Sequence, residues 1–171
     1  MIFSRNRFLV FAALAAGLFA GAAIFFPAGG ALAADLKISA PWSRATVRGA
    51  SVGVGFLTIA NTGTAPEQLL GATTPSAEKV EIHETRSEGG VMTMRALPEG
   101  VAIKPGATLV LKPGSFHLML VGLKAVLLPG EIVHLTLNFA KAGPIAVDLP
   151  VASFGATGPT AAPEDPPQIS Y

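Results

Sequence analysis

Methionine and histidine gather in one part of the sequence, between His83 and Met119. The chain holds four methionines and three histidines. Apart from the initiator, every methionine lies in this stretch (Met92, Met94 and Met119), as do two histidines, His83 and His117. A core built on leucine and valine has little need for methionine as a flexible filler, so the clustering indicates a chemical role. Imidazole nitrogen with thioether sulfur is a ligand set suited to a soft metal ion, above all Cu(I).

The alternation of side chains along a β-strand predicts which of these residues share a face. In the predicted strand 116–123, His117 and Met119 point the same way, so the dipeptide spacing places a nitrogen beside a sulfur. In the predicted strand 78–84, His83 points away from the apolar side chains. Each histidine is therefore expected on the face that does not form the core.

Met92 and Met94 share a face of a third predicted strand, 91–95, which follows Gly89-Gly90 in a hairpin with a loose loop. Core packing would be the usual role of such methionines. If this hairpin lies near the strand 116–123, two nitrogens and at least two sulfurs converge. Nothing local in the sequence requires that convergence. The candidate metal-binding residues are His83, Met94, His117 and Met119, with Met92 as an additional candidate.

The N-terminus has the pattern of an export signal. Arg5 and Arg7 precede an uncharged apolar run, 8–26, and Ala31-Leu32-Ala33 fits a cleavage site, so residues 1–33 are interpreted as a signal peptide with a helical apolar core. An uncleaved membrane anchor is the alternative, because the run is just long enough to span a bilayer. No cysteine follows it to carry a lipid. We therefore expect a periplasmic protein, with the signal segment as its only route to membrane attachment.

Charge and composition narrow the function classes. Without Arg5 and Arg7, ten basic residues remain against eleven acidic ones, a formal net charge of −1. No basic patch survives, which argues against nucleic-acid binding. The chain contains no cysteine, so it forms no disulfides, and a blue-copper electron carrier, which needs a cysteine thiolate, is excluded.

The region after residue 33 has the pattern of an all-β domain. Short apolar stretches alternate with Pro-Gly and Asn-Thr-Gly turn signals, which is typical of a β-sandwich or barrel, and no segment has convincing helical periodicity. Residues 153–171 are rich in proline, alanine and glycine and are predicted to form a flexible, disordered tail. The predicted strands are Leu36–Ser39, Ser51–Ala60, Gln68–Ala72, Glu78–Glu84, Val91–Arg95, Val101–Ile103, Thr108–Leu111, Phe116–Leu123, Glu131–Phe139 and Ile145–Val151.

Two other functions compete with copper binding. A zinc- or copper-dependent enzyme could use His83, His117 and either Glu81 or Glu84, but the methionines would then have no role, and no general base is evident. A metal-free, exported β-sandwich could instead use its methionines to contact a protein. The third histidine, His134, is expected to be solvated, and the glutamates near the hairpin are expected on an exposed face.

The pattern of histidines and methionines resembles that of a known family, the periplasmic copper chaperones called PCuAC (PCu(A)C or DUF461-like). His83 and Met94 enclose ten residues, and His117-Leu-Met119 completes the family pattern. Met94 and His117 enclose 22 residues, one more than in the shorter form of the pattern. The segments 112–123 and 40–46 also look like the family. Some members carry an extra methionine at the position of Thr85.

The resemblance covers about residues 36–151 and has specific implications. It implies a cupredoxin-like Greek-key β-barrel copper-chaperone domain over residues 34–152. It further implies that one Cu(I) ion per chain is bound through His83, Met94, His117 and Met119. The copper would be delivered by ligand exchange to the CuA centre of cytochrome c oxidase subunit II, alongside a Sco-type protein. We expect a monomer without enzymatic activity.

Overall fold

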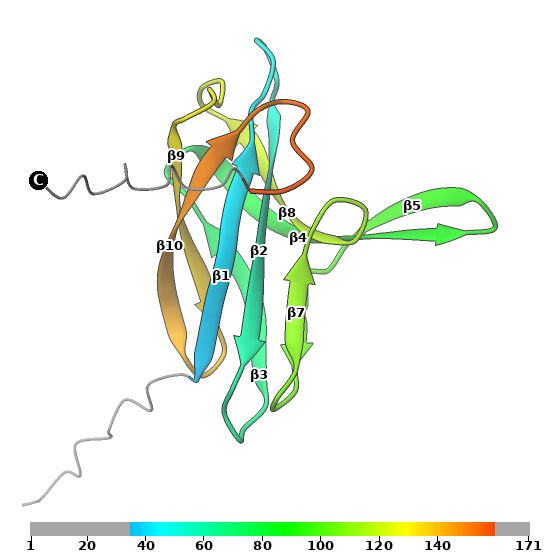
Figure 1. Cartoon of the computed structure of the whole chain (residues 1–171), viewed down its shortest axis with the longest axis vertical. Helices are drawn as coiled ribbons and strands as arrows, with labels where there is room; N and C mark the ends of the chain where they lie inside the picture. Colours follow the sequence, from blue (N-terminus) through cyan, green and yellow to red (C-terminus); the bar gives the residue numbers. More distant parts are fainter. Residues whose placement is uncertain (1–34, 160–171) are drawn as a thin grey trace, which may run out of the picture. The chain divides into compact units, whose positions relative to one another are not determined.

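The computed structural model describes residues 35–159, which form ten β-strands and, within this range, no helix (Figure 1). The predicted signal segment 1–33 and the end of the predicted tail, 160–171, lie outside the described residues. Among the described residues, no helix is long and apolar enough to cross a membrane. The strands are β1 (Leu36–Arg44), β2 (Val52–Asn61), β3 (Glu67–Thr73), β4 (Ala77–Glu88), β5 (Val91–Ala96), β6 (Val101–Ile103), β7 (Thr108–Leu111), β8 (Phe116–Leu123), β9 (Ile132–Phe139) and β10 (Gly143–Ala152).

The strands form one sheet that closes on itself. Their order is β5-β4-β8-β7-β2-β1-β10-β9-β3-β6, and β4 also pairs with β3 while β8 also pairs with β2. Most neighbouring pairs are antiparallel, but β1 pairs with β10 in parallel, and so does β7 with β8. The prediction of an all-β barrel is therefore confirmed. The outer part of the β4–β5 hairpin projects from the side of the barrel (Figure 1).

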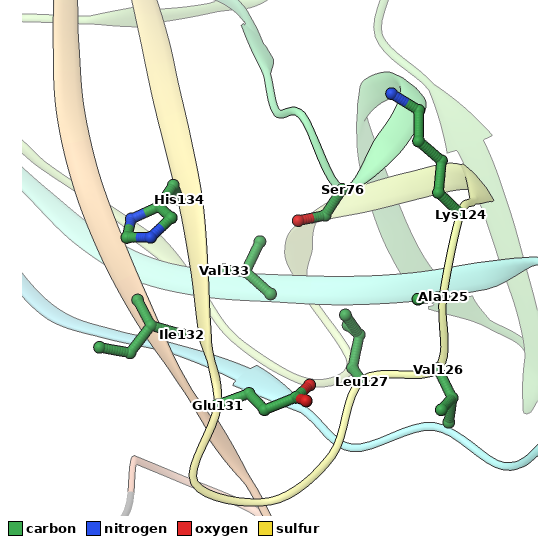
Figure 2. Close-up of a pocket in the computed structure, with 9 residues that line it drawn as sticks. All are labelled: Ser76, Lys124, Ala125, Val126, Leu127, Glu131, Ile132, Val133 and His134. Atoms are coloured by element: carbon green, nitrogen blue, oxygen red, sulfur yellow. The ribbon is translucent and has the colours of Figure 1, made fainter.

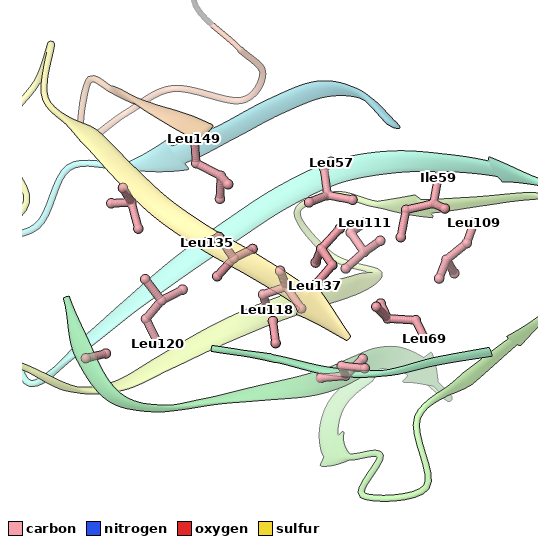
Figure 3. Packing of buried hydrophobic residues seen from close by; sticks show 14 of the residues in the cluster. Leu57, Ile59, Leu69, Leu109, Leu111, Leu118, Leu120, Leu135, Leu137 and Leu149 are labelled. Atoms are coloured by element: carbon pink, nitrogen blue, oxygen red, sulfur yellow. The ribbon is translucent and has the colours of Figure 1, made fainter. Parts of the chain in front are cut away.

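Leucine fills the interior of the barrel and fixes which face of each strand points inward (Figure 3). Leu118 and Leu120 of β8 are completely buried, and Ile82 of β4 is 3% exposed. The packing is close at Gly55 of β2, where an added Cβ would lie 2.9 Å from a methyl group of Leu149, and that side chain would have to shift. Full burial stabilises each such side chain by about 1.5–3 kcal/mol. The residues between them, including both candidate histidines, must therefore face outward.

A bulge in β1 changes the face on which its second half lies. The pairing with β2 shifts by one residue between Ser39 and Trp42, around Ala40, whose φ is +48°. Such a shift exchanges the inner and outer faces of a strand. Trp42 consequently lies against Phe56 of β2, outside the main core. The predicted strand ended at Ser39, because Pro41 has no N–H for a regular ladder, whereas the observed strand continues through the bulge to Arg44.

The β4–β5 hairpin is longer and tighter than predicted. β4 continues to Glu88 and β5 begins at Val91, and these two residues form a pair next to the turn. The prediction of a loose loop is therefore wrong. Gly89 and Gly90 have φ values of +59° and +83°. Two consecutive positive φ angles are typical of the two-residue turn that matches the twist of a β-hairpin. This turn determines the register of the hairpin and thus the position of Met94.

The first residues of the predicted tail contact the barrel. The backbone carbonyl of Ala156 accepts hydrogen bonds from Arg44, at 3.1 Å from Nε and 2.7 Å from Nη2. Ala156 also packs against the buried cluster of Trp42 and Phe56. Residues 153–159 thus differ from the disordered segment that their composition predicted, because two aromatic side chains and one guanidinium provide contacts for them.

Glu67 joins β3 to the turn between β9 and β10. Its carboxylate accepts backbone hydrogen bonds from Gln68 (2.8 Å), Lys141 (3.0 Å) and Ala142 (2.9 Å). Burial alone would raise the pKa of Glu67, but these three N–H donors lower it below its usual value. A lowered pKa means that the folded state favours the carboxylate, so the stabilisation is present above the unfolded-state pKa and is lost as the pH falls through the folded-state pKa.

We predict that Glu67→Ala lowers the free energy of unfolding at neutral pH by about 1–3 kcal/mol, because three partly buried N–H donors lose a charged acceptor. Urea unfolding followed by Trp42 fluorescence measures this quantity. The stability difference between the wild type and the variant should shrink as the pH falls into the range where the carboxylate of the wild type is protonated. A difference that stays constant down to that range would contradict the role of the ionised carboxylate.

Candidate metal centre

His83 and His117 lie directly opposite each other on neighbouring strands. The antiparallel register of β4 and β8 pairs these two residues. Their ring centroids are 5.9 Å apart, with an interplanar angle of 44°. His117 is 6% exposed and the side chain of His83 is 14% exposed, although both lie on the outer face of the sheet. Two imidazoles far apart in the sequence are thus brought together in a sheltered place.

The hydrogen bonds of His83 leave its second ring nitrogen without a partner. Nε2 lies 3.0 Å from Oε2 of Glu81, whose other oxygen accepts a hydrogen bond from Lys79 at 2.6 Å. Lys79, and then His83, lower the pKa of the Glu81 carboxyl, so this group is a carboxylate acceptor at neutral pH. The tautomer with a proton on Nε2 follows from this contact, and Nδ1 carries the lone pair. Nδ1 is buried and has no hydrogen-bond partner among the described residues.

A buried imidazole nitrogen without a partner is costly unless a ligand satisfies it. Carboxylate–histidine pairs are a common support for metal-binding imidazoles, because the carboxylate fixes the tautomer and makes the other nitrogen more basic. The environment of His83 therefore fits a metal ion at Nδ1. Strand alternation places Glu81 on the same face as His83. Sequence reasoning missed Glu81 as the hydrogen-bond partner of His83, although the spacing Glu-x-His was an available signal.

His117 has the opposite arrangement of its ring nitrogens. Nδ1 lies 3.0 Å from the backbone carbonyl oxygen of Ser115, which can only accept. The proton is therefore assigned to Nδ1, and the lone pair lies on Nε2. The two histidines thus present one basic nitrogen each, Nδ1 of His83 and Nε2 of His117. The role of Ser115 depends on a backbone atom, so its residue type in the sequence gave no signal for it.

Met119 lies on the same face of β8 as His117, one pair of residues further along. It pairs with Glu81 on β4 and with Val54 on β2. Met119 is half-buried on β8, between these two strands. Because consecutive residues of one strand face are about 7 Å apart, the flexible Met119 side chain can approach the ring of His117.

Met94 approaches the same face from the other side of β4. It pairs with Thr85 in the hairpin, and Met92 pairs with Ser87, so both thioethers share the face of His83. Met94 is 56% exposed and Met92 is 60% exposed. Neither methionine is a core filler. Met94 is paired with the residue two positions after His83 on β4. Met92 is paired with the residue four positions after His83, closer to the turn.

An aromatic cluster on the outer face of the barrel lies next to Met119. The rings of Trp42 and Phe56 stack with centroids 4.6 Å apart, and Val54, the cross-strand partner of Met119, packs against them. The guanidinium of Arg44 lies 5.7 Å from the Trp42 ring centroid. Trp42 is 4% exposed and serves as a packing anchor on this face. This cluster gives the methionine end of the candidate site a rigid neighbour.

Glu84 does not lie on the solvated face that the sequence analysis predicted. It is 8% exposed and forms ion pairs with Arg86 (2.8 Å) and Arg95 (3.0 Å). The Arg86 guanidinium, followed by that of Arg95, lowers the pKa of the Glu84 carboxyl. Strand alternation places Glu84 on the opposite face from His83. Within residues 35–159, no three His, Cys, Asp or Glu side chains form a group that could hold a metal ion.

His134 lies apart from the other two histidines. Its side chain is 69% exposed, and Nδ1 lies 2.7 Å from Oδ1 of Asp148, which confirms the predicted solvated position. It borders a cavity of about 510 Å³ that Figure 2 shows. Ser76 and Lys124, which also line this cavity, precede β4 and follow β8, at the end of β8 away from His117. This cavity is therefore separate from the histidine pair.

Solved structures with the same fold define the class of this domain. The copper-bound PCuAC domain from PmoF2 has a TM-score of 0.60 at 24% identity and covers 70% of this chain and 93% of its own. The solution structure of CuI-DR1885 from Deinococcus radiodurans has a TM-score of 0.58 at 29% identity and covers 72% of this chain and 83% of its own. The barrel with its projecting hairpin is a PCuAC-type domain, which confirms the resemblance noted in the sequence.

Sequence relatives identify the family more closely. A family model described as "Putative lipoprotein LpqE-like" matches residues 36–151, and the chain belongs to this LpqE-like family. A relative named "Putative lipoprotein Lxx21020", from Leifsonia xyli subsp. xyli, is 35% identical over 147 residues, covering 84% of this chain and 87% of the relative. Bacterial lipoproteins carry their lipid on a cysteine, and the 171 residues of this chain include none.

The assigned tautomers lead to a prediction for the metal-free protein. At about pH 8, two-bond ¹⁵N–¹H NMR should show His83 protonated at Nε2 and His117 protonated at Nδ1. Glu81→Leu should give His83 a mixture of tautomers, because the carboxylate acceptor is lost, and should leave the His117 tautomer unchanged as an internal control. A proton on Nδ1 of His83 in the wild type would disprove the assignment.

Proposed function

We propose that this protein is an exported Cu(I) carrier that holds one Cu(I) ion between Nδ1 of His83, Nε2 of His117 and the sulfurs of Met94 and Met119. The observation that carries the proposal is the His83–His117 pair, in which each ring is hydrogen-bonded at one nitrogen and offers the other. Imidazole and thioether together suit Cu(I) better than harder divalent ions. Two solved structures with this fold, the copper-bound PCuAC domain from PmoF2 and CuI-DR1885, support copper as the ligand.

The contrast between buried and exposed ligands supports a carrier. The histidines are sheltered, whereas Met94 is more than half exposed on an edge strand. Thioethers carry no proton, form no disulfide and bind Cu(I) less tightly than thiolates, so the ion can be held and then released. Catalysis is not part of the proposal, because the carboxylate of Glu84 is held by two arginines and that of Glu81 by Lys79 and His83.

The proposed location is the periplasm. The charged and apolar pattern of residues 1–33 and the lipoprotein name of the relative both support export. In an oxidising compartment a site made of methionine and histidine cannot be lost to disulfide formation. Its methionines can still be oxidised to the sulfoxide.

We predict that the wild type binds one Cu(I) per chain in an anaerobic competition titration with a Cu(I) indicator. The double variant Met94→Leu/Met119→Leu should lose this binding and keep its fold, because Met-to-Leu exchange costs less than about 1.5 kcal/mol in a packed protein. His134→Ala is the matched control, since it removes a histidine that lies apart from the pair, and it should bind like the wild type. Wild-type affinity in the double variant would refute the ligand set. Purified protein that binds no Cu(I) would favour the metal-free interaction module.

The proposed acceptor is the apo CuA centre of cytochrome c oxidase subunit II, with a Sco-type protein as a second partner. Transfer should be favourable because thiolate ligands hold Cu(I) more tightly than thioethers and imidazoles. Anaerobic mixing of the loaded protein with the soluble domain of subunit II, followed by separation and metal analysis, should find copper on the acceptor. Subunit II with alkylated thiols should receive none. Copper that stays on the carrier with an intact acceptor would argue against this partner.

A further inference from the structure

Met92 is placed where neither packing nor the four proposed ligands explain it. It lies on β5, whose six residues are all exposed and which, within residues 35–159, pairs with β4 alone. A methionine that is 60% exposed gives up most of the roughly 1.5–3 kcal/mol that burial would contribute. A structural filler would therefore be expected elsewhere in the fold.

The register arranges the thioethers as a row that leads away from the histidines. Along the face that carries His83, the successive cross-strand pairs are Thr85 with Met94 and then Ser87 with Met92. Residues two apart on a strand are about 7 Å apart, and each methionine side chain has three rotatable bonds. The sulfurs of Met92 and Met94 can therefore approach one ion together, while Met92 lies one pair further from His83 than Met94 does.

The residues opposite the two methionines leave this row open to a soft ion. Thr85 and Ser87 offer small hydroxyl groups, which are hard ligands with little affinity for Cu(I). The charged residues of the hairpin lie on its other face, where Glu84 binds Arg86 and Arg95. The Glu84–Arg95 ion pair joins β4 to β5 at the base of the hairpin, so the thioether face of the hairpin can remain exposed without depending on apolar packing.

We propose that Met92 is an exchange ligand for Cu(I): it binds the ion transiently with Met94 as the ion enters or leaves the site formed with His83 and His117. This inference rests on the proposed function. In the exchange step, the Met92 sulfur donates a lone pair and forms a Cu–S bond as one Cu–N bond to a histidine breaks. Copper remains Cu(I), and the thioether neither gains nor loses a proton. Met92 therefore controls the rate of transfer and contributes little to the affinity at equilibrium.

The test measures rate and affinity separately. Wild type and Met92→Leu are loaded with Cu(I) without oxygen and mixed with bicinchoninate in a stopped-flow instrument. The limiting transfer rate at saturating bicinchoninate should fall at least about fivefold in Met92→Leu, which corresponds to about 1 kcal/mol in the barrier. The equilibrium affinity for Cu(I) should stay within about twofold of the wild type, a difference of less than 0.5 kcal/mol.

A matched control moves the thioether to the other face of the same strand. Val91 is adjacent to Met92, is similarly exposed at 64%, and pairs with Glu88 on the opposite face of the hairpin. The double variant Met92→Leu/Val91→Met therefore keeps the number of exposed methionines in β5. Its transfer rate should remain as slow as that of Met92→Leu. Recovery of the wild-type rate would overturn the proposal, because any exposed methionine would then suffice.

X-ray absorption at the copper edge gives a readout that does not depend on transfer. The wild type and Met92→Leu should show the same number of sulfur and nitrogen ligands. Fewer sulfur ligands in Met92→Leu, or a tenfold loss of affinity, would make Met92 a permanent ligand and overturn the proposal. If the wild type binds Cu(I) and Met92→Leu transfers it at the wild-type rate, this inference alone fails. If the wild type binds no Cu(I), the proposed function fails as well.

Discussion

The antiparallel pairing of β4 with β8 is the constraint on which the candidate metal centre depends. It places His83 opposite His117, and the buried side chains on the reverse face, Ile82 and Leu118, hold that register. A slip of one residue would turn the histidine of one strand into the leucine core and expose the apolar residues of that strand to water. The hydrophobic core therefore determines the geometry of a polar site that it does not touch.

The candidate ligands differ in exposure: the two histidines are sheltered, whereas Met94 is exposed. Hydrogen bonds from Glu81 and the Ser115 carbonyl set the tautomers of the two imidazoles, which are sheltered by the surrounding residues. Met94, by contrast, lies on an exposed edge strand of a projecting hairpin. In the proposed function, the histidines define where the ion binds, and the hairpin methionines give an incoming acceptor access to it. The sheltered histidines thus lie on β4 and β8, whereas the exposed Met94 lies on β5.

The outer face of the barrel has its own small core, which depends on one irregularity. The bulge around Ala40 turns Trp42 outward to stack on Phe56 beside Val54, the neighbour of Met119. An uninterrupted β1 would place the large indole inside a barrel already filled by leucine. The same bulge brings Arg44 to the carbonyl of Ala156, which extends the ordered structure past the last strand.

The all-β class, most of the strands and the face of each candidate residue could be predicted from the sequence, because the alternation of side chains is a local property. The sequence also indicated the chemistry, through the clustering of His83, His117 and the methionines. Only the tertiary structure decided that these two histidines are cross-strand partners, that Glu84 is buried between arginines, and that Met94 lies on an exposed strand. Register, burial and hydrogen-bond partners depend on contacts between residues remote in the chain, and those contacts leave no trace in local periodicity.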